Sequence, residues 1–127
     1  MSEEKRKLLQ EYLKIGSPVL LENINQKIFE KDVIIESDCD ISLLNGHYEG
    51  TEFLPPKWYT KLKENSILVI NNINKIPSEE QTKFIEILKY KKISTFDLPK
   101  NCIIIVTATN LKENKINEEI YSLLAHI

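Results

Sequence analysis

Three asparagines follow apolar stretches of the chain, where a polar side chain could contact a ligand. Asn71 and Asn72 come directly after the apolar run 66–70, and Asn110 follows the run 102–106 by a few residues. An amide side chain cannot act as a general base, and it is a poor, uncharged partner for Mg²⁺. These asparagines therefore suit either a strand-to-loop cap or a residual polar site for an unidentified ligand.

An acidic cluster and two histidines are the other candidates for chemistry. Glu36, Asp38 and Asp40 could hold a divalent cation, which would make the chain a metal-dependent enzyme, but a solvated loop is the simpler interpretation. His47 and His126 have no Cys, Asp or Glu at a ligand or triad spacing, so we assign them surface or loop roles. We therefore predict neither a metal site nor a bound cofactor.

Three aromatic residues could instead anchor a protein partner. Phe53, Trp58 and Tyr59 lie close together in the sequence, and aromatic side chains are favoured at the centre of interfaces. Packing of a short helix onto a sheet is the alternative explanation for them. The lysines at 89, 91 and 92 are too few, in a chain of net charge -2, to indicate nucleic-acid binding.

Length and composition are those of one soluble domain, residues 1–127. The apolar fraction of 42% is enough for a single core, and no apolar run approaches the ~20 residues of a membrane span. Cys39 and Cys102 lie far apart, as expected for reduced thiols. We therefore expect a cytoplasmic protein.

Strands and helices are predicted to alternate along the chain. Short apolar runs predict strands, and amphipathic patterns predict helices that begin near Ser2, Pro55, Pro77 and Asn117, with Ser78 and Gln81 at capping-box spacing. The strands are expected at 18–21, 33–35, 66–70 and 102–106, with a polar connector at 23–32 and a loop at 38–54. Such alternation indicates a parallel sheet with helices on both faces.

From residue 46 onward the order of features resembles the AAA+ ATPase core, nearest its MoxR-like branch. The strand 66–70 leads into Asn71-Asn72, a helix then begins Pro-x-x-x-Gln at 77–81, and a later strand runs into Asn110. In the family these features are an Asp-Glu pair, a Pro-x-x-x-Gln helix and a sensor Asn. The resemblance covers residues 16–127 and implies a four-stranded parallel sheet of order 1-4-3-2, with the family's fifth strand missing.

At the positions that match the family's ATP-binding residues, this chain has residues of other types. A P-loop needs glycines that wrap the phosphates and a lysine followed by a hydroxyl, whereas residues 23–30 hold no glycine and place Phe29 and Glu30 at those last two positions. Asn71 and Asn72 replace the family's Asp-Glu pair. Ala125-His126 replaces the Asp-Arg that ends in the arginine finger, and Arg6 is the only arginine in the chain.

The resemblance therefore implies a catalytically inactive AAA+-like module that acts through protein contacts, in a regulatory or assembly role. Its expected partner is an active AAA+ ATPase or a second copy of the chain. The alternative is a weak binder of a nucleotide or small ligand, which would use the remnant cleft around Asn71, Asn72 and Asn110.

Overall fold

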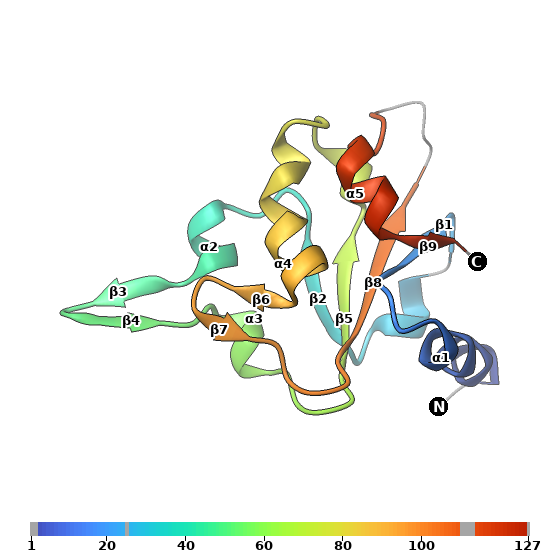
Figure 1. Cartoon of the computed structure of the whole chain (residues 1–127), viewed down its shortest axis with the longest axis horizontal. Helices are drawn as coiled ribbons and strands as arrows, with labels where there is room; N and C mark the ends of the chain where they lie inside the picture. The colour runs from blue at the N-terminus through green and yellow to red at the C-terminus, as the bar shows by residue number, and fades with distance from the viewer. Residues whose placement is uncertain (1–2, 25, 110–113, 127) are drawn as a thin grey trace.

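The computed structural model describes residues 3–24, 26–109 and 114–126. Its main sheet is parallel throughout, in the strand order β2-β5-β8-β1-β9 (Figure 1). The strands are β1 (Val19–Glu22), β2 (Val33–Glu36), β5 (Ile67–Asn71), β8 (Ile103–Ala108) and β9 (Ala125–His126). When the four longer strands are numbered along the chain, their order is 1-4-3-2, as predicted.

The expectation that a fifth strand is missing is wrong. The chain leaves the helix α5 (Glu118–Leu123) through Leu124, which is buried and extended, and this places the next residues beside β1. The Ala125 amide donates to the Pro18 carbonyl at 2.8 Å, and Ala125 pairs with Val19 in the sheet. Two residues are enough to extend the sheet because they complete the free edge of β1.

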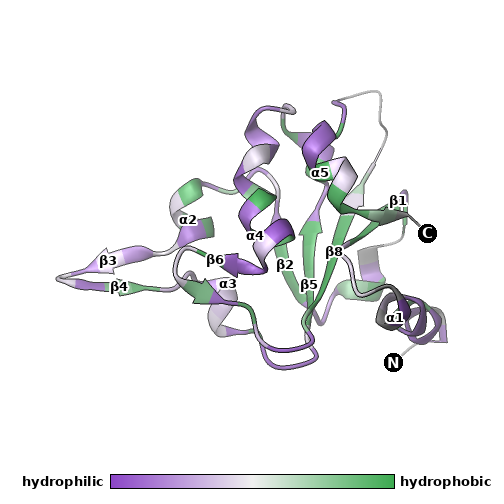
Figure 2. Cartoon of the chain, in the orientation of Figure 1, coloured by the Kyte–Doolittle hydropathy of each residue, from purple (hydrophilic) through white to green (hydrophobic). Residues whose placement is uncertain are grey.

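Helices cover both faces of this sheet, so the predicted three-layer arrangement is confirmed (Figure 1). The helix α1 (Glu3–Ile15) packs on one face, where Tyr12 belongs to the same buried cluster as Val19, Leu21 and Val69. The other face carries the 3₁₀ turn η3 (Glu80–Phe84), the helix α4 (Ile85–Tyr90) and α5. Parallel strands covered on both faces are expected to be apolar along their length, as β5 and β8 are in Figure 2.

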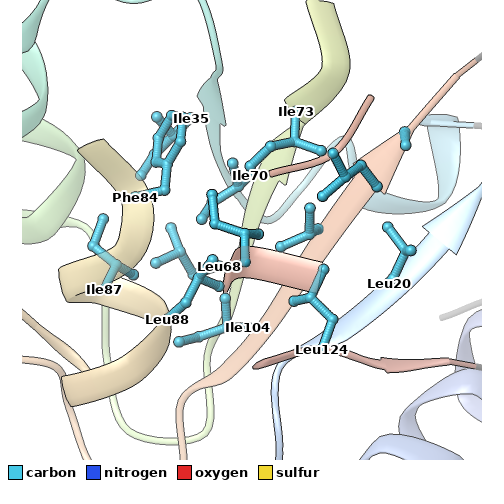
Figure 3. Packing of buried hydrophobic residues seen from close by; sticks show 14 of the residues in the cluster. Leu20, Ile35, Leu68, Ile70, Ile73, Phe84, Ile87, Leu88, Ile104 and Leu124 are labelled. Atoms are coloured by element: carbon cyan, nitrogen blue, oxygen red, sulfur yellow. The ribbon is translucent and has the colours of Figure 1, made fainter. Parts of the chain in front are cut away.

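The larger core lies between the sheet and α4. Because side chains alternate along a strand, Leu68 and Ile70 of β5 point to this side, where they meet Phe84, Ile87 and Leu88 (Figure 3). Ile70 and Ile104, which the sequence predicts to be central, are 0% and 3% exposed. The apolar runs therefore predicted both the strands and the core correctly.

The segment 38–54 is not the loop that we predicted. It forms a short helix α2 (Ile41–Asn45) and a hairpin of β3 (His47–Glu49) and β4 (Glu52–Leu54). Gly50, at φ 64°, begins the two-residue turn of the hairpin, and the Tyr48 and Phe53 rings pair across it with centroids 4.9 Å apart. A side chain at Gly46 would lie 2.4 Å from the Leu54 carbonyl oxygen, so only glycine fits where the hairpin closes.

The other elements of the described residues are small: η1 (Gln26–Phe29), α3 (Lys57–Thr60), η2 (Ile73–Lys75) and a hairpin of β6 (Lys92–Ile93) and β7 (Phe96–Asp97). The predicted capping box of Ser78 and Gln81 is wrong, because the fully buried Gln81 side chain donates to the Ile76 and Lys115 carbonyls instead. Asn117 does cap α5, since its Oδ1 accepts from the Glu119 amide at 2.9 Å. In the described part of the chain no helix is long and apolar enough to cross a membrane.

Candidate functional site

The strands β2, β5 and β8 finish side by side at the carboxyl end of the sheet. This arrangement brings Glu36, Asn71 and Thr107 together. Asn71 is 5% exposed. Its Nδ2 donates to both Glu36 carboxylate oxygens at 3.1 Å, and its Oδ1 accepts from the Thr107 hydroxyl at 2.7 Å. The amide of Asn71 therefore bridges the two neighbouring strands on either side of β5.

The backbone of Asn72 is fixed by the same neighbours. Asn72 has left-handed dihedrals, φ 54° and ψ 56°, a conformation that asparagine tolerates better than most residues. Its N–H donates to the Thr107 hydroxyl oxygen at 2.9 Å, and its carbonyl accepts from the Ser37 hydroxyl at 2.6 Å. A glutamate at this position, as in the AAA+ pattern, would be strained.

The Asn74 side chain also connects the segments that follow β5 and β8, through hydrogen bonds. It is fully buried, its Oδ1 accepts from the Thr109 N–H at 3.2 Å, and its Nδ2 donates to the Thr109 carbonyl. The Asn74 carbonyl also accepts from the Asn114 side chain at 3.1 Å. Asn110, the remaining predicted site residue, lies outside the described residues.

These bonds form a polar network that connects three strands, in which Asn71, Asn74 and Thr107 are buried and Glu36 is exposed. Buried amides and hydroxyls that bond each other in this way are rigid, and a ligand could replace these bonds only by breaking them. Asn71 and Asn72, which are consecutive at the end of β5, both have hydrogen-bond partners within the protein, Asn71 through its side chain and Asn72 through its backbone. Of the two interpretations that the sequence allowed, this geometry favours the strand-to-loop cap.

The segment after β1 is held in place by a backbone hydrogen bond and by apolar packing. Asn23 turns the chain with φ 52° and donates its amide to the Ala108 carbonyl at 3.0 Å. A single 3₁₀ turn, η1 (Gln26–Phe29), follows, and it ends at Phe29, which is 1% exposed. Phe29 packs in the core under α1, beside Tyr12 and Leu21. The position that a phosphate-binding lysine would take in the AAA+ pattern is therefore part of the apolar core.

The three predicted partner-binding aromatics are half-buried, and each contacts another element of the domain. The Trp58 indole N–H donates to the Leu44 carbonyl at 3.0 Å, and the Tyr59 hydroxyl donates to the Asp97 carbonyl. Phe53 stacks on Phe96 with ring centroids 5.9 Å apart. All three side chains thus have structural contacts.

The acidic loop does not gather its carboxylates into one site. Asp38 pairs with Lys75 at 3.1 Å, and this hydrogen bond lowers the pKa of the Asp38 carboxyl. The Glu36 carboxylate accepts from Asn71, as described above. Across residues 3–24, 26–109 and 114–126, no group of three or more His, Cys, Asp or Glu side chains could hold a metal ion.

The two cysteines are free and half-buried. Burial raises the pKa of the Cys39 thiol, and it raises the pKa of the Cys102 thiol to about 11. Both thiols are therefore protonated at neutral pH, and neither has the thiolate character of a reactive cysteine.

Sequence reasoning missed the hydrogen-bonding roles of Thr107, Asn74 and Gln81. Of these, only Thr107 directly follows an apolar stretch, which is the available signal for a buried hydrogen-bonding role. Gln81 connects three segments, because its Oε1 also accepts from the Asn117 amide at 2.7 Å. The partners themselves are distant in sequence, and only the fold reveals them.

Comparisons with known proteins inform the fold. No protein-family model matches the sequence, and no curated protein is significantly similar to it. Among solved structures, the crystal structure of NtrX from Brucella abortus is similar, with a TM-score of 0.59 and 14% identity over 98% of this chain. The chain spans 35% of the length of that NtrX chain. At this identity the likeness shows a shared α/β fold, with a parallel sheet flanked by helices.

Proposed function

We propose that this chain is a catalytically inactive AAA+-like module of the cytoplasm, which acts through protein contacts in a regulatory or assembly role. Its proposed partner is an active AAA+ ATPase or a second copy of the chain. The main support is the closed polar network at the strand ends, where Asn71 is bonded to Glu36 on one side and to Thr107 on the other.

Phosphoryl transfer requires groups that these positions do not supply. Catalysis depends on an amide cradle and a lysine at the phosphates, on carboxylates that hold Mg²⁺, and on an arginine that offsets transition-state charge. Here Phe29 is buried at the lysine position, and Asn71 and Asn72 replace the carboxylates. Arg6 is the chain's only arginine, and it lies on α1.

Exposed apolar side chains support a role in protein contacts. Ile41 and Leu43 of α2 are 61% and 65% exposed, and Tyr48 of the neighbouring hairpin is 72% exposed. The hairpin extends away from the sheet (Figure 1). Apolar side chains that cluster along one exposed segment are typical of interaction surfaces.

Turnover of ATP by the protein and by the double substitution Asn71→Asp with Asn72→Glu tests the proposal. We expect no Mg²⁺-dependent hydrolysis from either protein, because the substitutions restore the acidic pair but neither the cradle nor the arginine. A Lys89→Ala variant purified in the same way controls for contaminating ATPases. Turnover above that control, from either protein, would contradict the proposal.

A further inference from the structure

One edge of the main sheet is open along β2. This strand is hydrogen-bonded to β5 on one side and is the last strand in the order on the other. The Ser37 N–H donates to the Asn71 carbonyl, so the odd-numbered residues of β2 bond to β5. Because this pattern alternates along a strand, the N–H and C=O of Ile34 and the N–H of Glu36 point to the open edge.

A groove of about 630 Å³ runs along this edge, between β2 and α3. Its apolar lining includes Ile34, Leu43 and Trp58, of which Ile34 is 37% and Leu43 is 65% exposed. The groove thus offers backbone hydrogen-bonding groups beside apolar side chains. Strand addition requires this combination, because main-chain bonds supply affinity and side-chain pockets supply specificity.

The charges at the groove favour an acidic partner. Lys31, Lys57 and Lys61 line it, and within the described residues none of the three forms an ion pair. The two acidic residues that line it are already engaged, because Asp32 pairs with Lys5 and Glu36 accepts from the Asn71 amide. Three ammonium groups around an apolar strip therefore match carboxylates that flank apolar side chains.

We infer that the open edge of β2 binds an extended segment of a partner protein, in which acidic residues flank alternating apolar residues. The bound segment adds a strand to the sheet beside β2. The inference deepens the proposed function, since it names the contact surface and the chemistry of the partner. A second copy of the chain is a poorer occupant, because antiparallel pairing of two β2 strands centred on Ile34 would place Asp32 opposite Glu36.

Trp58 provides the readout, because it is the only tryptophan and it lines the groove. The probe is a blocked peptide, Glu-Asp-Val-Thr-Val-Thr-Val-Asp-Glu, and its control has lysine at every acidic position. We expect a saturable change in Trp58 fluorescence with the acidic peptide, and binding at least tenfold weaker with the basic one. No saturable change up to millimolar acidic peptide, or equal binding of both peptides, would overturn the inference.

Two substitutions with matched controls locate the binding. Ile34→Pro removes the outward N–H and no bond to β5, and it should weaken the acidic peptide at least tenfold more than Ile34→Thr, which keeps that N–H. Lys57→Glu with Lys61→Glu should weaken it at least tenfold, whereas Lys7→Glu with Lys100→Glu, an equal change in charge on exposed residues outside the groove, should leave it within twofold. If neither Ile34→Pro nor the substitution of the groove lysines changed the affinity for the peptide, the peptide would bind elsewhere on the protein.

Two further results separate this inference from the proposed function. Stabilisation of the protein by Mg-ATP would favour a nucleotide binder over a module that acts through protein contacts alone, and it would leave the peptide result unchanged. Concentration-dependent dimerisation in sedimentation, abolished by Ile34→Pro, would assign the edge to a second copy and overturn the acidic partner.

Discussion

Two regions at the carboxyl end of the sheet are held together by different interactions. At the ends of β5 and β8, the polar side chains remain and bond one another, as Asn71 does with Thr107. After β1, the chain makes one 3₁₀ turn and buries Phe29 in the core under α1. Hydrogen bonds between side chains hold the first region, and apolar packing holds the second.

The difference indicates how strongly a substitution in each region should affect the stability of the protein. A hydrogen-bonded network can be altered one residue at a time, and each change affects only the bonds of that residue. A buried aromatic ring is packed on several sides, so replacing it with a phosphate-binding group would leave a cavity or a buried charge. We therefore expect substitutions at Phe29 to affect stability most, and substitutions in the network to have graded and smaller effects.

The largest effect is expected at Phe29. Phe29→Ala should lower the free energy of unfolding by ~3–5 kcal/mol, because it removes a fully buried ring between α1 and the sheet. Phe29→Leu should cost much less, since it keeps most of the apolar volume. Urea denaturation of the three proteins measures both values. A loss below ~1 kcal/mol for Phe29→Ala would mean that this segment is not part of the core.

The opposite face of the sheet provides the reference for that comparison. Ile104→Ala should cost ~2–5 kcal/mol, and Ile104→Val ~0.5–1.5 kcal/mol, as expected for a residue in the larger core. The same urea measurements apply. If Ile104→Ala proved neutral, the assignment of β8 as a central strand would be incorrect.

In the network, Thr107→Val should cost ~1–3 kcal/mol. The substitution keeps the shape of the side chain but removes the hydroxyl that donates to Asn71 and accepts from the Asn72 N–H, so two poorly exposed polar groups lose a partner. Thr107→Ser keeps the hydroxyl and should recover most of the loss. Equal destabilisation by Val and Ser would attribute the effect to packing instead of hydrogen bonding.

The smallest effect is expected from Asn71→Asp, and it should depend on pH. The new carboxyl would face the Glu36 carboxylate, so the pKa of one of them is raised in the folded state. A raised carboxyl pKa destabilises the folded state above the unfolded value near 4, so the loss relative to the parent should be small at pH 4. It should grow to ~1 kcal/mol at pH 7, which corresponds to less than one pKa unit. Unfolding curves at both pH values test this, and a loss that is larger at pH 4 would contradict it.

The sequence predicted the sheet and the main helices because their apolar runs are long and continuous, as at 66–70 and 102–106. It failed at 38–54, where the hairpin depends on the Gly50 turn and on the Tyr48–Phe53 pair, which are weak local signals. From its resemblance to the AAA+ core, the sequence also singled out Asn71 and Phe29. Their partners could not be predicted, because Glu36 and Thr107 are each 35 or more residues from Asn71 and meet it only after the strands pair.

The thermal stability of the protein with and without Mg-ATP tests the central claim most directly. A ligand present at 100 times its dissociation constant stabilises a protein by ~2.7 kcal/mol, which raises the melting temperature of a domain of this size by several degrees. With Mg²⁺ alone as the control, we predict that millimolar Mg-ATP leaves the melting temperature unchanged. A reproducible rise of several degrees would show that a nucleotide site survives and would contradict the account.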